Sequence, residues 1–146
     1  MVIVFDMDNT LADEFGATLR PGMVALLERL LREKHTLVLW TNSKRDRARQ
    51  ILRSHELQQY FSTSIFRENY DPHEKGVPKD IRKIKGDFLI DDDPAEIAYV
   101  RSIGKKGFCI SAYRKGSTPA TQELAEVYRS ITTAQSVWGK LFRSSQ

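Results

Sequence analysis

Hydrophobic and polar residues follow two different patterns along this chain. Short, mostly apolar runs recur from the first residue to about residue 112, and the longer segments between them carry apolar residues three or four positions apart. Short runs of this kind are typical of buried β-strands, and the wider spacing is typical of amphipathic helices. The five predicted strands are MVIVFD, TLVLWT, STSIF, DFLIDD and GFCISA.

The first two predicted helices follow the first two strands. The segment RPGMVALLERLLREKH has one apolar face, which is made by Val24, Leu27, Leu30 and Leu31. The segment SKRDRARQILRSHELQQYF is basic and polar, and its opening S-x-x-D pattern predicts Ser43 as the residue that caps the helix.

Two further helices are predicted in the second half of the chain. The segment DPAEIAYVRSIG has Asp93 as its N-cap, Pro94 at the first helical position and Gly104 at its end. The segment STPATQELAEVYRSI has a similar beginning, so we expect its helix to start at Thr118 and Pro119.

Strands and helices that alternate at this spacing predict an α/β fold. We expect a single Rossmann-like domain with a central parallel sheet of about five strands, helices on both faces and no cap domain. The strands are apolar throughout, as is typical of a sheet covered on both sides. One domain is predicted over residues 1–146, with a core over residues 1–131 and a C-terminal helix or tail over residues 132–146.

The composition argues against several other classes of protein. No apolar run is long enough to cross a membrane, so no membrane partner is expected, and the N-terminus lacks the basic segment of a signal peptide. Cys109 is the only cysteine, so no disulfide forms within the chain, and a reducing, cytoplasmic location is expected.

The net charge of +4 is concentrated in the C-terminal third. Residues 101–146 carry eight basic and two acidic residues, whereas residues 1–100 carry 15 basic and 17 acidic residues. A basic region favours anionic substrates or nucleic acid. Because these basic residues are scattered, a solvated surface that keeps the protein soluble explains the same pattern.

Two carboxylates end the first predicted strand, in the stretch VIVFDMDNT. In an extended chain Asp6 and Asp8 point to the same side, and two such charges about 4 Å apart repel each other by about 4 kcal/mol at an effective dielectric constant near 20. The pair needs a proton or a cation between its members, and a carboxylate site of this kind suits Mg²⁺. A plain turn explains Asp8 and Asn9, but not Asp6 at the end of an apolar strand.

Another apolar strand ends in three carboxylates, in the stretch LIDDDP. Asp93 already has a structural role as a helix cap. Asp91 closes the strand and is the natural further metal ligand, and Asp92 either binds the metal through water or orients Lys79. The alternative is that all three aspartates only favour the dipole of the following helix.

The predicted phosphate-binding groups lie in two other segments. Thr41 and Asn42 end the strand LVLWT and precede a helix N-terminus, which provides free backbone N–H groups. A phosphate that faces carboxylates also needs a fixed positive charge, and KGVPKDIRKIKGD supplies the candidates. We favour Lys79 over Lys75, because a lysine beside the positive end of a short helix is easier to explain if it faces an anion.

Taken in chain order, FDMDNTLA, LWTNS, Lys79 and IDDDP resemble the four motifs of the haloacid dehalogenase-like (HAD) superfamily. The resemblance covers residues 1 to about 112. It implies a Mg²⁺-dependent hydrolase of the phosphomonoester phosphatase class, in which Asp6 is the nucleophile that forms an aspartyl-phosphate and Asp8 is the general acid and base. A carboxylate at Asp8 implies phosphoryl transfer rather than dehalogenation.

The same resemblance assigns the binding groups. Thr41 and Lys79 would hold the phosphoryl oxygens, with Asn42 as a further substrate-binding residue. Mg²⁺ would be held by Asp6, the backbone carbonyl of Asp8 and Asp91, with help from Asp92.

Lid domains of this superfamily are inserted after the first motif or between the second and third. About 25 residues separate NTLA from LVLWT and about 35 separate Ser43 from Lys79, so the chain resembles a capless member. Its layout is similar to the capless C-terminal-domain phosphatase-like and magnesium-dependent phosphatase-like groups. It departs from the first of these in DMDNT, where that group has DLDET, and in Asp92, where that group has Asn.

Capless members often act on large phosphates. The implied substrate is therefore a phosphoprotein or another large phosphate. A nucleic-acid end (3′-) phosphatase, a small-metabolite phosphatase and a non-catalytic phosphate-binding scaffold are the alternatives, and the sequence defines no oligomeric state.

Overall fold

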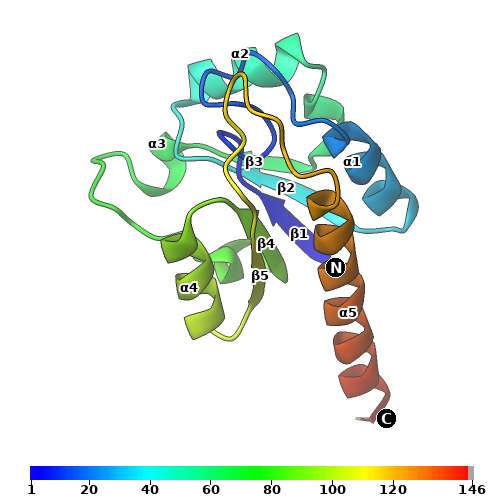
Figure 1. Cartoon of the computed structure of the whole chain (residues 1–146). Helices are drawn as coiled ribbons and strands as arrows, with labels where there is room; N and C mark the ends of the chain where they lie inside the picture. Colours follow the sequence, from blue (N-terminus) through cyan, green and yellow to red (C-terminus); the bar gives the residue numbers. More distant parts are fainter. Residues whose placement is uncertain (145–146) are drawn as a thin grey trace.

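Five parallel strands form one sheet at the centre of the protein (Figure 1). The computed structural model describes residues 1–144, with side chains described up to residue 137. The strands are β1 (Val2–Phe5), β2 (Thr36–Trp40), β3 (Thr63–Ile65), β4 (Phe88–Asp91) and β5 (Lys106–Cys109). Their order across the sheet is β3-β2-β1-β4-β5. The predicted α/β class and the five-stranded parallel sheet are confirmed.

Helices cover both faces of this sheet. They are α1 (Met23–Arg32), α2 (Arg45–Ser54), α3 (Arg67–Tyr70), α4 (Pro94–Ser102) and α5 (Glu123–Ser144), with short 3₁₀ helices η1 (Gln58–Tyr60) and η2 (Ile81–Ile84). Apolar side chains of α1, α2 and α5 pack against one face, and those of α4 and η2 pack against the other. Within residues 1–144, the connections between these elements hold no additional domain.

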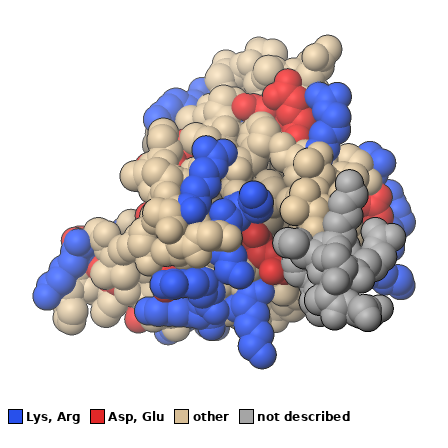
Figure 2. All heavy atoms as spheres, turned by 90° about the horizontal axis from the view of Figure 1, so that it is seen from below, with Lys and Arg blue, Asp and Glu red and all other residues tan. Residues whose placement is uncertain are grey.

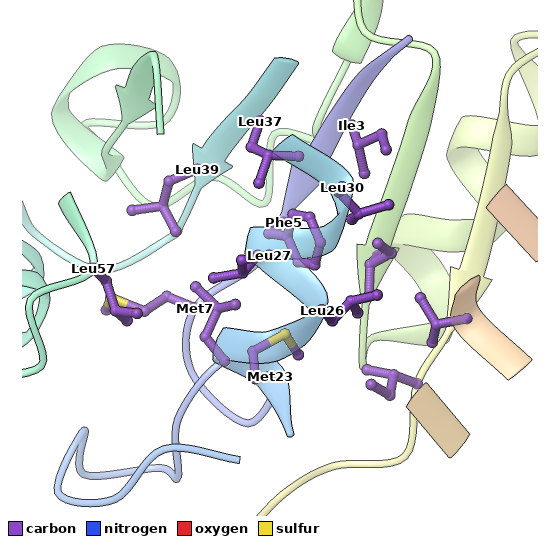
Figure 3. Packing of buried hydrophobic residues seen from close by; sticks show 14 of the residues in the cluster. Ile3, Phe5, Met7, Met23, Leu26, Leu27, Leu30, Leu37, Leu39 and Leu57 are labelled. Carbon is purple, nitrogen blue, oxygen red and sulfur yellow. The ribbon is translucent and has the colours of Figure 1, made fainter. Parts of the chain in front are cut away.

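The core lies on both sides of the central strand. Ile3 and Phe5 of β1 pack against Leu27 of α1 on one face (Figure 3). Val4 points to the other face and packs with Ile97 of α4. All five side chains are buried, which explains why the strand is apolar at every position rather than at every second one.

The apolar face of α1 is close to the predicted one. Leu27 and Leu30 are fully buried, whereas Val24 and Leu31 lie beside them and are only half-buried. Leu26 takes a buried place that the sequence pattern did not assign to it. The buried stripe is therefore turned slightly around the helix from its predicted position.

The predicted caps have different outcomes. Asp93 caps α4 as predicted, because its carboxylate accepts a hydrogen bond from the backbone N–H of Ala95 at 2.9 Å. The prediction for α2 is wrong, since the N-cap is Lys44 and not Ser43. The backbone N–H of Ser43 instead donates to the hydroxyl oxygen of Thr41 at 3.0 Å, which keeps Ser43 in the loop before the helix.

The start of α5 is also later than predicted. Thr118 and Pro119 lie in an irregular segment, and the helix begins at Glu123. The Glu123 carboxylate accepts a hydrogen bond from the backbone N–H of Ser111 at 2.9 Å and lies 3.5 Å from Nη1 of Arg20. These contacts fix the first turn of the helix beside β5 and favour a late start.

The C-terminal residues continue the same helix. From Glu123, α5 runs without a break to Ser144. Residues 145–146 of the predicted C-terminal helix or tail lie outside the described residues. Among the helices that are described, none combines the length and the hydropathy that crossing a bilayer requires.

Candidate active site

Three strand ends meet at one edge of the sheet. The central strand β1 pairs with β2 on one side and with β4 on the other, so the direction of the crossovers reverses at β1. Ligands of parallel α/β sheets bind beyond the carboxyl ends of the strands at such a point. A cleft of about 890 Å³ opens at this edge. Its lining includes all seven predicted site residues: Asp6, Asp8, Thr41, Asn42, Lys79, Asp91 and Asp92.

A buried ion cluster lies at the base of the cleft. The Lys79 ammonium donates to Oδ1 of Asp6 at 3.0 Å and to Oδ2 of Asp91 at 2.7 Å. All three residues are at most 8% exposed. The backbone N–H of Asp6 donates to the carbonyl of Ile90 at 3.0 Å, so the β1–β4 ladder continues to Asp6 and fixes where its side chain begins.

Burial and charge act in opposite directions on this cluster. Burial raises the pKa of Asp6 to about 6 although the Lys79 cation opposes the rise. Burial raises the pKa of Asp91 to about 6 as well, and the neighbouring Asp6 carboxylate adds to the rise. The two carboxylates hold the pKa of Lys79 well above its usual range despite the burial of the ammonium group. One lysine therefore does not fully balance the two carboxylates.

A third carboxylate adds to the negative charge. Oxygen atoms of Asp6, Asp91 and Asp92 lie within 4.8 Å of one another. The hydroxyl of Thr10 lies 3.2 Å from Oδ2 of Asp6 and 3.3 Å from Oδ1 of Asp92, so it donates to one of the two. Burial raises the pKa of Asp92. Three buried or half-buried carboxylate oxygens against one ammonium group form a hard oxygen site with uncompensated charge, which fits Mg²⁺.

Asp8 lies in a different environment from Asp6. Its side chain is 29% exposed, and both of its oxygens lie 3.0 Å from Nη1 of Arg47. The Arg47 guanidinium also donates to the hydroxyl of Ser43 at 2.9 Å and to the carbonyl of Glu14 at 3.1 Å. Asp8 therefore lies at the mouth of the cleft, where α2 and the loop after β1 meet, and not among the three clustered carboxylates.

The end of β2 forms the facing wall of the cleft. Thr41 is 1% exposed, and its hydroxyl oxygen accepts the backbone N–H of Ser43 at 3.0 Å. Asn42 is exposed, and its carbonyl oxygen accepts a hydrogen bond from Nε of Arg67 at 2.8 Å. The two residues thus line one wall at different depths.

The two candidate lysines are clearly separated. Lys75 lies exposed in the loop before η2, where its backbone N–H donates to the carboxylate of Asp71 at 2.8 Å. Lys79 is held in place from behind, because its backbone N–H donates to Oε2 of Glu96 at 2.8 Å. The structure therefore brings Lys79, and not Lys75, to the carboxylates.

A buried arginine holds the loop that follows Asp8. The guanidinium of Arg20 is hydrogen-bonded to the carbonyls of Thr10 at 2.8 Å, Asn9 at 2.9 Å and Ser111 at 2.6 Å. Asn9 adopts a left-handed backbone conformation with φ of 63°. Since Thr10 contacts Asp6 and Asp92, Arg20 acts on the position of these carboxylates through the loop.

Three residues of this arrangement were not predicted from the sequence. Arg47 belonged to a helix described only as basic and polar, and the position of α2 brings it to Asp8. Arg20 lay in a segment interpreted as the start of a helix. Thr10 is the one that could have been found, because it lies in the same short stretch, DMDNT, as Asp6 and Asp8.

Comparisons with known proteins agree with this architecture. A family model described as "Protein of unknown function (DUF705)" matches residues 1–103. No curated protein matches the chain.

Solved structures with a similar fold include several HAD-superfamily hydrolases. One from Ehrlichia chaffeensis has a TM-score of 0.66 at 13% identity, covering 89% of this chain and 97% of its own. One from Geobacter sulfurreducens, of subfamily IA, has a TM-score of 0.62 at 13% identity, covering 88% of this chain and 97% of its own. A chain of the Pnkp1/Rnl/Hen1 RNA repair complex has a TM-score of 0.60 at 15% identity, covering 78% of this chain and 43% of its own. The predicted HAD-like fold is confirmed.

Proposed function

The chain belongs to the DUF705 family of proteins of unknown function, and we propose that it is a Mg²⁺-dependent phosphatase that hydrolyses a phosphomonoester. One observation carries this proposal. Two buried carboxylates, Asp6 after the central strand and Asp91 at the end of β4, share the single lysine Lys79 in an open cleft of a HAD-like fold. Burying these charges is costly for stability. Clusters of this kind are therefore found mainly where they serve binding or chemistry.

In the first step, Oδ of Asp6 attacks the phosphorus atom of the substrate. The bond from phosphorus to the ester oxygen breaks, and a proton carried by Asp8 goes to that oxygen, so the alcohol leaves. The phosphoryl group is now bonded to Asp6. Lys79 and Thr41 hold the phosphoryl oxygens, and Asn42 contacts the substrate nearer the mouth of the cleft.

In the second step, the Asp8 carboxylate takes a proton from a water molecule. The water oxygen attacks the phosphorus atom, the bond from phosphorus to Asp6 breaks, and inorganic phosphate leaves. Asp8 is suited to both steps because it is half-exposed at the mouth, where an alcohol leaves and water enters.

The role proposed for Mg²⁺ follows from the oxygen atoms that would bind it. Asp6, Asp91 and Asp92, with the backbone carbonyl of Asp8, would hold Mg²⁺. When bound, it would supply positive charge that offsets the negative charge between the carboxylates and the phosphoryl oxygens. The open cleft and the absence of an added domain in residues 1–144 support a large phosphate as substrate, and a cytoplasmic location stays a prediction.

The test is release of phosphate from p-nitrophenyl phosphate. We expect release in Mg²⁺, loss after chelation, recovery when Mg²⁺ is added back, and loss in Asp6→Asn. Rapid acid quenching should trap a phosphoryl group on the peptide that contains Asp6. Full activity after chelation, or in Asp6→Asn, would overturn the proposal. A protein that binds phosphate but releases none would be a phosphate-binding scaffold instead.

A further inference from the structure

One wall of the cleft is basic, and the basic residues continue beyond it. Lys44, Arg47 and Arg67 line the cleft on the side formed by α2 and α3. Arg45 and Arg49 follow on α2, and their guanidinium carbons lie 5.7 Å and 5.6 Å from the centre of the Phe66 ring. Basic residues thus lead from the mouth of the cleft along one helix.

Two of these cations, Arg47 and Arg67, are ion-paired with Asp8 and Glu74. The other three, Lys44, Arg45 and Arg49, form no ion pair among the described side chains. Lys44 is exposed at the N-terminus of α2. The side chain of Arg47 is 42% exposed, and its bonds to Asp8, Ser43 and Glu14 involve its two terminal nitrogens only.

The acidic groups of the outer cleft are, by contrast, already occupied. The Asp71 carboxylate accepts three backbone N–H groups, from Lys75, Gly76 and Val77, at 2.8, 3.0 and 3.2 Å. Asp93 caps α4, and Glu96 accepts the backbone N–H of Lys79. Their negative charge is partly offset by these dipoles, which weakens their repulsion of an anion that enters along the basic wall.

The cleft also contains an aromatic ring in a fixed position. Tyr70 lines it, half-buried, and its ring meets the buried Trp40 edge-on, with ring centres 5.3 Å apart and planes at 76°. Tyrosine rings of this kind are platforms on which nucleic-acid bases stack, at about 1–3 kcal/mol per base.

We propose that the substrate of this site is the phosphorylated end of a nucleic-acid strand. The terminal phosphate lies at Asp6, the base next to it stacks on Tyr70, and the following phosphates lie along Lys44 and the basic residues of α2. This inference rests on the proposed phosphatase function and names its substrate class. A basic wall with an aromatic ring favours a strand of regularly spaced phosphates over a phosphopeptide, which supplies a single strong anion.

The basic residues of other surfaces do not carry the same inference. Figure 2 shows lysine and arginine side chains spread over the face seen from below, in groups separated by other residues. Arg101 of α4 is used internally, because its guanidinium donates to the carbonyl of Gly107 on β5 at 3.1 Å. The wall formed by α2 differs because it borders the cleft that holds Asp6.

The first test measures binding apart from catalysis. The Asp6→Asn variant is titrated with fluorescent oligonucleotides that carry a 3′-phosphate, a 5′-phosphate or no phosphate, and with a phosphopeptide of similar length. We expect tighter binding of an oligonucleotide with one of the two terminal phosphates than of the peptide, and a steep loss of affinity with salt. Equal or tighter binding of the phosphopeptide would overturn the inference.

The second test compares substrates in the active protein. Lys44→Ala should lower kcat/KM for the phosphorylated oligonucleotide at least about threefold more than kcat/KM for p-nitrophenyl phosphate. It should also reduce the slope of log(kcat/KM) against log[salt] by about 1, as loss of one phosphate contact does. Lys44→Glu should have the larger effect of the two. Lys83 is exposed and lies outside the cleft, so Lys83→Ala is the matched control. It should leave kcat/KM unchanged for both substrates.

Tyr70→Leu tests the stacking platform. It should weaken oligonucleotide binding by about 1–3 kcal/mol, or roughly 5- to 150-fold, and lower affinity for a short and a long strand by the same factor. If Lys44 and Tyr70 variants affect the oligonucleotide and p-nitrophenyl phosphate equally, the inference fails while the phosphatase function stands. If wild type hydrolyses neither substrate, the phosphatase function itself has failed.

Discussion

Asp6 and Asp13 are two buried aspartates at the two ends of the same short loop, and their pKa values move in opposite directions. Asp6 is 8% exposed and Asp13 is fully buried. Burial raises the pKa of Asp6 to about 6, whereas the pKa of Asp13 is lowered to about 2 although burial opposes the change. The cause is the donors: Asp13 accepts from the hydroxyl of Thr18 and from the backbone N–H groups of Phe15, Ala17 and Thr18.

The comparison separates a carboxylate whose hydrogen bonds are satisfied from one that faces like charges. Asp13 has four donors from its own loop and closes a tight turn with them. Asp6 has Lys79 and one shared hydroxyl, and it faces two further carboxylates. A buried acid with all its hydrogen bonds satisfied stabilises the fold, while one left against like charges is available to a cation and a substrate.

The largest expected effect is on catalysis. Asp6→Asn should lower kcat on p-nitrophenyl phosphate by more than about 10⁴-fold, because it removes the nucleophile that we propose. Asp13→Asn should retain its kcat when measured per folded molecule. Steady-state kinetics on both variants, with circular dichroism to count folded protein, checks the contrast. Equal losses in the two variants would mean that the two carboxylates do not differ in role.

The second effect is a loss of stability when Lys79, the lysine that Asp6 and Asp91 share, is replaced. Lys79→Met should reduce the free energy of unfolding by about 3–5 kcal/mol at neutral pH, because it leaves Asp6 and Asp91 buried without their cation. Urea denaturation without divalent ions measures the change. Lys83→Met, at an exposed position, is the control and should lie close to wild type. A small effect at Lys79 would show that water already reaches the carboxylates.

The third effect is the stabilisation of the folded protein by Mg²⁺, which should depend on the clustered carboxylates and not on Asp13. Mg²⁺ at about 100 times its Kd should stabilise the wild-type protein by about 2.7 kcal/mol, seen as a rise in Tm. Asp91→Asn should remove most of this shift, since it deletes one of three clustered carboxylates. Asp13→Asn should keep the shift, starting from a lower Tm. A Mg²⁺ shift that survives in Asp91→Asn would locate the metal elsewhere.

The smallest effect depends on pH. Because the pKa of Asp13 is lower in the folded protein than in the unfolded chain, ionised Asp13 contributes about 2 kcal/mol of stability above about pH 4. This contribution is lost as the pH falls through about 2. The difference in unfolding free energy between wild type and Asp13→Asn should therefore shrink between about pH 4 and 2. A difference that stays constant over this range would contradict the role assigned to the carboxylate.

Sequence patterns were sufficient to predict the architecture of the sheet and the carboxylates that follow its strands. Continuous apolar runs predicted a sheet covered on both faces, and the parallel order then brought Asp6, Thr41 and Asp91 to one edge without further information. The spacing around Pro94 also identified the cap of α4 at Asp93. These features depend on residues close in sequence or on the direction of parallel strands.

Contacts between side chains that are far apart in the sequence could not be predicted from the sequence. Ser43 fits a cap motif, but Thr41 takes its backbone N–H, so Lys44 becomes the cap. Arg47 is one of several similar basic residues, and only packing of α2 decides that it meets Asp8. Asp13 has no motif, because its four donors come from a turn that forms only when the loop folds.

The anchoring of Arg20 has a consequence for how the protein can be divided. The family match ends at residue 103 and contains every acidic residue of the site, but two partners of Arg20, Ser111 and Glu123, lie beyond it. A fragment that ends at residue 103 would contain all the acidic residues of the site, but Arg20 would keep only its bonds to Asn9 and Thr10. The last third of the chain therefore helps to position the loop that follows Asp6, although it contributes none of the acidic residues of the site.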